Sequence, residues 1–285
     1  MIQLKNILIE DNPKLIRGVY IMPCFEDIEA YLRRKCVSKN RIKKYHTILK
    51  LMYKLGINSA HIGMQTLDDF FFYLQDSGLS DETKYTYWCI FKKIVIYTYP
   101  NMIKYFSNYV IKIRPKIVNI LTVEEINSIS EYTNSLRDNI FVCLLYEGGF
   151  RFGEIRNISR NDVIFDEHGA KITVNGKTGV RQVRVVCCAE KLKRFFEEDK
   201  RDMPFCFSET FANRHILKPA AEKAGITKRV YPHLFRHSRA THLSKYLNDR
   251  QLCIFFGWSK TSDMPARYSH LTMEDVDEKI INMSK

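Results

Sequence analysis

Five side chains in the second half of the sequence are of the types that together can cut a phosphodiester bond. They are Arg151, Lys177, His233, Arg236 and Tyr268. A tyrosine offers an oxygen nucleophile that can bond to phosphorus, and each arginine offers a planar, permanently charged fork for two non-bridging oxygens. Lysine and histidine provide an acid for the leaving oxygen and a base for the nucleophile. Long intervals separate the five residues, so they form one site only if the tertiary fold brings them together.

Each of these side chains also has an ordinary interpretation when it is taken alone. Arg151 suits a surface position at the start of a helix, Lys177 suits the tip of a hairpin, and Tyr268 suits a core or capping position. Accepting an ordinary interpretation for each of the five side chains requires five coincidences, whereas one shared phosphate site explains the residues together.

The histidines raise the alternative of a metal site. His233 and His237 are four residues apart and would share one face of a helix. However, no acid lies between them as in the H-E-x-x-H zinc motif, and Arg236 and Arg239 would repel a cation. We therefore expect neither a metal nor another cofactor, and we interpret His237 and His242 as packing or capping residues.

The charge balance favours a polyanionic partner. The 285 residues carry 45 Lys and Arg against 32 Asp and Glu, a net charge of +13. Between Tyr31 and Lys50 there are eight Lys or Arg and no acid, whereas an ordinary solvated helix face mixes both signs. Double-stranded DNA is the expected partner, and the predicted phosphate-contacting residues are Arg33, Arg34, Lys35, Lys39, Arg41, Lys43, Lys44 and Lys50, with Lys112, Arg114 and Lys116 further on.

The hydrophobic pattern predicts a mainly α protein with a small antiparallel sheet, in two domains. Residues 1–107 are predicted to form a helical DNA-binding domain, with helices over 25–36, 37–56, 64–78 and 79–100. In the second helix we expect Ile42, Tyr45, Ile48, Leu49, Met52 and Tyr53 on one face, and in the third we expect Thr66 as the N-cap. Residues 108–119 contain a proline and three bases and are predicted to be a linker that follows the DNA backbone, with an edge strand as the alternative.

Residues 120–285 are predicted to form the second domain. An apolar helix should end at Gly148 and Gly149, and three short strands should follow, with Asn175-Gly176 as a hairpin turn and Lys177 at its tip. A helix with a kink at Pro219 is expected before the stretch that holds His233, and an amphipathic helix over 272–284 closes the sequence. No apolar run is long enough to cross a membrane and no signal-peptide pattern opens the chain, so we expect a cytoplasmic protein whose eight cysteines are mostly reduced core thiols.

Several short motifs, in this order and approximate spacing, resemble the tyrosine recombinases, also called integrases. Gly149-Phe150-Arg151 with Glu154 is similar to the first-arginine box, and Gly176-Lys177-Thr178-Gly179 to the catalytic-lysine turn. His233-Leu234-Phe235-Arg236-His237 resembles the H-x-x-R-H box, and Ala266-Arg267-Tyr268 resembles the nucleophile box. Phe256-Gly257-Trp258 is similar to the L-G-H turn with Trp in place of His. The motifs cover residues 120–285, whereas the N-terminal part resembles the core-binding domain in character only.

The resemblance implies a role for each matching residue. Tyr268 would attack the scissile phosphate and form a 3′-phosphotyrosyl link, while Arg151 and Arg236 would hold the non-bridging oxygens. Lys177 would protonate the 5′-oxygen, and His233 would take the tyrosine proton. The remaining two residues support the site: Glu154 would steady it, and Trp258 would pack on it and donate its indole N–H. No ATP or metal is implied.

The resemblance also implies an assembly and a range of functions. Four protomers would act on two DNA sites, starting from a free monomer or dimer, and the last helix of each would dock on a neighbour. The length and the Trp258 turn are most similar to the Xer class, in particular its archaeal members, which resolves chromosome dimers at dif-like sites during chromosome partition and cell division. Three alternatives remain open: a virus or plasmid integrase, a type IB topoisomerase-like enzyme, and a non-catalytic DNA-binding relative.

Overall fold

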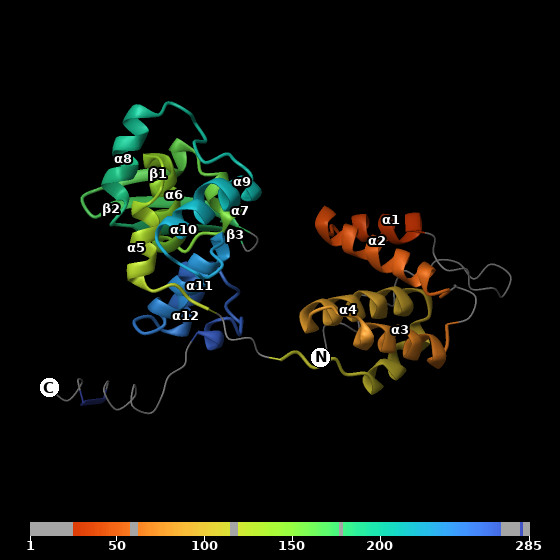
Figure 1. Ribbon diagram of the computed structural model, residues 1–285. Coiled ribbons are helices and arrows are strands. Elements are labelled where there is room, and N and C mark those ends of the chain that lie inside the picture. Colours follow the sequence, from red (N-terminus) through yellow and green to blue (C-terminus); the bar gives the residue numbers. More distant parts are fainter. Residues whose placement is uncertain (1–24, 58–61, 115–118, 177–178, 269–279, 282–285) are drawn as a thin grey trace. The chain divides into compact units, whose positions relative to one another are not determined.

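The chain folds into two compact units, Met1–Lys116 and Ile117–Lys285, which are described here one at a time (Figure 1). The computed structural model describes residues 25–57, 62–114, 119–176, 179–268 and 280–281. The division falls inside the segment predicted to be a linker. Helices dominate both units, and a single three-stranded antiparallel sheet is present among the described residues, so the predicted fold class is confirmed. Within the same ranges, none of the helices combines the length and apolar character needed to cross a bilayer.

The first unit is a helical bundle built around one central helix. Its elements are α1 (Phe25–Arg34), α2 (Lys39–Lys54), α3 (Met64–Asp76), α4 (Asp81–Thr98) and a 3₁₀ turn (Pro100–Asn108). Ser80 is the N-cap of α4, and its side chain accepts a hydrogen bond from the Thr83 amide. Helix α4 packs against α2, α3 and the 3₁₀ turn. Aromatic rings fill the core, where Phe70 and Phe91 stack 3.9 Å apart beside Trp88.

Two details of the helices in this unit refine the prediction. Ile42, Tyr45, Ile48 and Met52 are buried, but Tyr53 is 88% exposed. Tyr53 lies on the same side of α2 as Ile42, eleven residues before it, so its exposure follows from its place in the last turn of the helix and not from its side of the helix. The N-cap of α3 is Gly63 and not Thr66, and the Thr66 hydroxyl accepts a hydrogen bond from the Gly63 amide three residues before it.

The second unit is arranged around α6 (Leu136–Glu147), whose apolar side chains are buried on several sides. The helices packed directly on α6 are α5 (Val123–Glu131), α7 (Phe152–Arg156), α8 (Ala189–Glu198) and α11 (Pro232–Leu243). Helix α12 (Asp249–Phe256) contacts α11, and α9 (Glu209–Phe211) leads through a π-helical stretch, Ala212–Leu217, into α10 (Lys218–Lys223). The irregular stretch comes just before Pro219, which lacks the amide that a regular helix would pair with the carbonyl four residues earlier.

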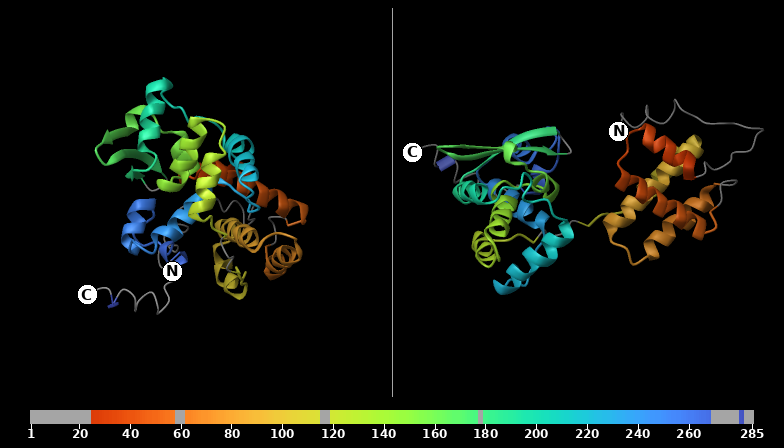
Figure 2. Two further views of the ribbon diagram at one scale, coloured as in Figure 1. Left: turned by 60° about the vertical axis from the view of Figure 1, so that its left-hand side comes forward. Right: turned by 90° about the horizontal axis from the view of Figure 1, so that it is seen from above.

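The sheet consists of β1 (Val163–Asp166), β2 (Gly169–Gly176) and β3 (Gly179–Val185) in sequential antiparallel order. Alternate residues bury one face against α7, α8 and α12, and Figure 2 shows the strands lying over the helices. Gly176 still pairs with Gly179, so Asn175 and Gly176 belong to the strand and not to the turn as predicted.

The buried carboxylate of Glu147 links the end of α6 to the segment between β3 and α8. It accepts hydrogen bonds from the backbone amides of Val186, Cys187 and Cys188. Three donors compensate for burying this charge, because a carboxylate left without partners would be costly. The cysteines fit the prediction only in part, since Cys188 is buried but Cys187 is exposed.

Candidate active site

Helix α11 presents three of the functional side chains from its first two turns. His233, Arg236 and His237 follow at intervals of three and one, which puts them on one side of the helix. Arg236 is 4% exposed, and its guanidinium donates to the carbonyl oxygens of Gly149 at 2.6 Å and Phe256 at 2.5 Å. The two backbone contacts hold the charged group in place and leave it available to a further acceptor.

A second arginine is held beside this group by a buried carboxylate. Arg151 precedes α7, and Glu154 accepts from its backbone amide at 2.8 Å and from its guanidinium at 2.7 Å. The same carboxylate accepts two hydrogen bonds from Arg181 on β3, at 2.7 and 2.9 Å. Burial raises the pKa of Glu154, but the bonds from Arg181 and Arg151 outweigh burial and hold it below its usual range. Glu154 is therefore ionised and orients both arginines.

Glycines allow the chain to approach the arginines closely. A Cβ at Gly176 would lie 2.6 Å from a carboxylate oxygen of Glu154, which is too close for any other residue without a shift. Gly257 ends α12 with φ +58°, a left-handed conformation that glycine adopts without strain. The resulting turn lets the Trp258 amide bond to the Cys253 carbonyl at 2.9 Å and brings the indole back towards the site.

The arginine cluster carries more positive charge than its own carboxylate neutralises. Burial, followed by the charges of Arg151 and Arg181, lowers the pKa of Arg236 to about 9, so it remains charged at neutral pH. Among these three arginines and Glu154, two positive charges are left over. A phosphodiester gains negative charge on its non-bridging oxygens as it is attacked, and a preorganised cationic site of this kind stabilises that charge.

Tyr268 lies in the same site and is fixed along its length. It is 6% exposed, its amide bonds to Pro265 at 2.8 Å, and its carbonyl accepts from the Ser244 hydroxyl at 3.0 Å. Its ring stacks on Trp258 with centroids 5.6 Å apart and planes 3° from parallel, and Trp258 stacks in turn on Phe256. Burial raises the pKa of the Tyr268 phenol, against the opposing charge of Arg236, so the hydroxyl is protonated in the free protein.

The structure places two further side chains in the site that the sequence interpretation did not assign to it. The Tyr268 hydroxyl is 2.5 Å from Nδ1 of His237, the residue interpreted as packing or capping, and not beside His233 as assigned. Arg181 was not singled out at all. The alternation of side chains along β3 indicates its position. Arg181 lies two residues before the buried Val183 and four before the buried Val185, so it shares the apolar face of the strand.

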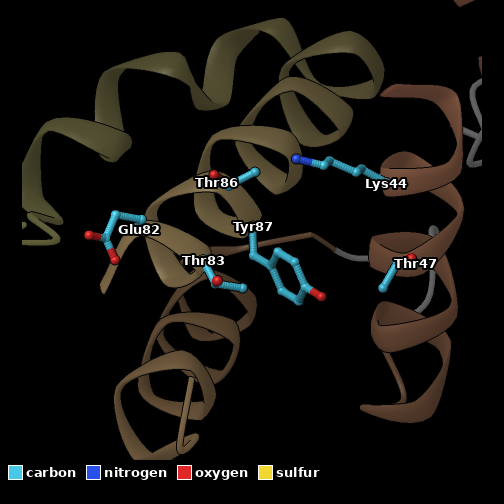
Figure 3. A pocket seen from close by; sticks show the side chains of 6 residues that line it. All are labelled: Lys44, Thr47, Glu82, Thr83, Thr86 and Tyr87. Carbon is cyan, nitrogen blue, oxygen red and sulfur yellow. The ribbon is translucent and has the colours of Figure 1, made fainter. Parts of the chain in front are cut away.

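The basic residues predicted to contact DNA all lie at the surface where they are described. Arg33, Arg34, Lys35, Lys39, Arg41, Lys43, Lys44, Lys50, Lys112 and Arg114 are exposed. Lys44 and Thr47 of α2 line a polar cavity of about 340 Å³ together with Glu82, Thr83, Thr86 and Tyr87 of α4. Figure 3 shows Lys44 reaching from α2 towards the threonines of α4. The lining of this cavity holds one cation, one carboxylate and four hydroxyl groups.

Three predictions fall outside the described residues. They are the position of Lys177, the contact of Lys116, and the docking of the final helix, of which the structure describes Ile280 and Ile281 alone.

Comparison with known proteins identifies the family of the chain. The model of the phage integrase family matches residues 119–275, which is more than half of the chain. The chain belongs to this family. Its members break and rejoin DNA, so the chain is an enzyme of the tyrosine recombinase type.

Individual relatives extend the comparison. A tyrosine recombinase of Thermosipho africanus is 26% identical over 255 residues, covering 78% of this chain and 85% of that protein. Tyrosine recombinase XerA of Pyrococcus horikoshii is 30% identical over 146 residues, covering 46% of this chain and 50% of that protein. The fold is similar to the Tn1549 transposon integrase solved in complex with circular intermediate DNA, with a TM-score of 0.71 at 16% identity, covering 90% of this chain and 97% of that one.

Proposed function

We propose that this protein is a site-specific recombinase that cuts and rejoins duplex DNA through a 3′-phosphotyrosyl intermediate. One observation carries the proposal: Arg236 donates to the carbonyl of Gly149, two residues before Arg151, and lies 5.8 Å from the Trp258 ring that stacks on Tyr268, so segments far apart in sequence bring these groups into one site. A buried phenol beside an excess of guanidinium charge is suited to attack on a phosphate whose oxygens the arginines bind.

Each side chain has a defined task in this mechanism. Arg151 and Arg236 bind the non-bridging oxygens, and Glu154 keeps Arg151 in position. Tyr268 forms the new bond to phosphorus, and Lys177 protonates the departing 5′-oxygen. The energy of the cleaved phosphodiester is retained in the phosphotyrosyl link, so rejoining needs no ATP. The phenolic proton passes to a histidine of α11.

The biological role that we propose is resolution of chromosome dimers at a dif-like site in the cytoplasm. The similarity to XerA of Pyrococcus horikoshii supports this role over that of a virus or plasmid integrase. Exchange of both strands requires two DNA sites and four active tyrosines, so we propose a homotetramer on DNA in which the final helix of each protomer docks on the next. Residues 1–107 would bind the same duplex through their basic surface.

A covalent-capture experiment tests the proposal and finds the DNA site in the same step. Duplexes with a randomised segment and a nick beside it are incubated with the protein, and adducts that survive denaturant are isolated and sequenced. The wild type should yield an adduct on one enriched sequence, and Tyr268→Phe should yield none. An adduct formed equally by Tyr268→Phe would contradict the assignment of the nucleophile, and the absence of any wild-type adduct would favour a non-catalytic DNA-binding protein.

The captured sequence then separates recombination from topoisomerase-like cutting. A recombinase should exchange strands between two duplexes that carry the site. A type IB topoisomerase-like enzyme should instead relax supercoiled DNA that lacks it, with no exchange.

A further inference from the structure

The contact between His237 and Tyr268 places a proton acceptor directly on the nucleophile. Nδ1 of His237 lies 2.5 Å from the Tyr268 hydroxyl, within hydrogen-bonding distance. The two side chains approach each other from α11 and from the turn after Pro265, 31 residues apart in sequence. The Trp258 stack and the Ser244 bond fix the remainder of Tyr268, so the hydroxyl cannot turn far from the imidazole.

The protonation states give this hydrogen bond a direction. Burial, followed by His233, Arg236 and Arg267, lowers the pKa of His237, so the ring is neutral at pH 7 and Nδ1 can accept. His233 and Arg236 belong to the same helix, whereas Arg267 comes from the turn that carries the tyrosine. The pKa of Tyr268 is raised by burial, so its hydroxyl keeps its proton and donates it to Nδ1.

His233 is placed differently. Burial and the charges of Arg236 and Arg151 lower its pKa, which puts its ring within the field of the two arginines that bind phosphate. Its ring centroid is 5.7 Å from that of His237. No hydrogen bond joins it to Tyr268 among the contacts of the described residues, and a position beside the arginines suits a donor to a phosphate oxygen.

We propose that His237, and not His233, is the general base of the strand-cutting step. This inference rests on the proposed function and deepens it. The bond from Tyr268 Oη to phosphorus forms while the bond from phosphorus to the 5′-oxygen breaks, and the electron pair of the broken bond goes to that oxygen. The phenolic proton moves to Nδ1 of His237, and the 5′-oxygen takes a proton from the general acid, the role proposed for Lys177. Rejoining reverses both transfers and returns the proton to Oη.

The arrangement also keeps the nucleophile inactive without DNA. The cationic surroundings of His237 oppose a second positive charge, so the imidazole is a weak base in the free protein. A DNA phosphate that binds to Arg151 and Arg236 brings a negative charge close to the ring and makes protonation easier. Tyr268 is thus activated when the substrate is in place.

The substitution His237→Asn isolates the proton transfer. An asparagine side chain places an amide oxygen near the position of Nδ1, so it accepts the hydrogen bond of Tyr268 but cannot take the proton. Single-turnover adduct formation on the nicked duplex is measured across a pH range that spans the ordinary histidine pKa of about 6.5. The wild-type rate should fall on the acid side as His237 becomes protonated. His237→Asn should be slower by about 10²–10⁴-fold and should lose this acid limb, with DNA affinity unchanged.

Matched variants keep the outcomes distinct. His233→Asn should retain the acid limb, even where its rate is reduced. His237→Asn that keeps both the wild-type rate and the acid limb would overturn the inference while leaving the recombinase function intact, provided that the wild type forms an adduct and Tyr268→Phe does not. Failure of the wild type to form an adduct would refute the proposed function instead. A thermal melt of each variant establishes that it is folded.

Discussion

Replacing Glu154 by glutamine should destabilise the second unit, because one buried carboxylate accepts charge-assisted hydrogen bonds from two arginines. Glutamine preserves the size and shape of the side chain but removes its charge. The side chain of Glu154 is 3% exposed and that of Arg181 is 9% exposed, so Arg181 would remain buried without a counter-charge. Removing one partner of a buried ion pair costs about 3–5 kcal/mol. Arg151, at 26% exposed, can turn partly towards water, which places the expected loss near the lower value.

Calorimetry of the full-length protein measures this loss. For a unit of this size, about 3 kcal/mol corresponds to a decrease in Tm of roughly 6–12 °C. The transition of the first unit should not move and serves as an internal reference. As a matched control, Glu198→Gln removes the carboxylate of an exposed pair with Arg194, whose side chains are 61% and 72% exposed. The control should change stability by no more than about 0.5 kcal/mol.

Two further measurements decide whether charge is the cause. The double variant Glu154→Gln/Arg181→Gln should be more stable than the sum of the two single changes implies, because it removes the charge left without a partner. The pKa of Glu154 is lower in the folded state than in the unfolded chain, so its contribution is complete above about pH 4.5 and is lost as pH falls. The gap between wild type and Glu154→Gln should therefore narrow in acid. Additive single changes, or a gap that does not depend on pH, would refute this account.

Two other predictions concern the anchor at the end of α6 and the DNA-binding face. Glu147→Gln should lower the stability of the second unit by about 2–3 kcal/mol, because a neutral amide replaces a carboxylate that accepts hydrogen bonds from three backbone amides. A loss of unfolding free energy below about 0.5 kcal/mol by calorimetry would contradict this prediction. DNA affinity, measured by fluorescence anisotropy, should fall steeply with salt, and Lys43→Gln/Lys44→Gln should reduce the log–log slope by about 2 if each lysine neutralises one phosphate. An unchanged slope would exclude these lysines from the interface.

The agreement between pattern and structure is best where the signal is local. Ser80 and Thr122, residue types that favour helix N-caps, cap α4 and α5, and the three short strands follow Gly149 as predicted. These features depend on interactions between residues a few positions apart. The differences at Tyr53 and Thr66 are also local, because both residues lie in end turns of correctly identified helices.

The sequence by itself determined which chemical groups are present and in what order, because the boxes around Arg151, Arg236 and Tyr268 are short runs whose residue types are visible without a fold. Tertiary structure alone decided which side chains meet. Whether the Tyr268 hydroxyl contacts His233 or His237 depends on how α11 is rotated and where the turn after Pro265 enters the site, and a shift of one helical turn would exchange them. The joining of Arg181 to Glu154 likewise depends on packing β3 against α7. Such contacts between distant segments are set by the packing of the whole unit, and no local pattern encodes them.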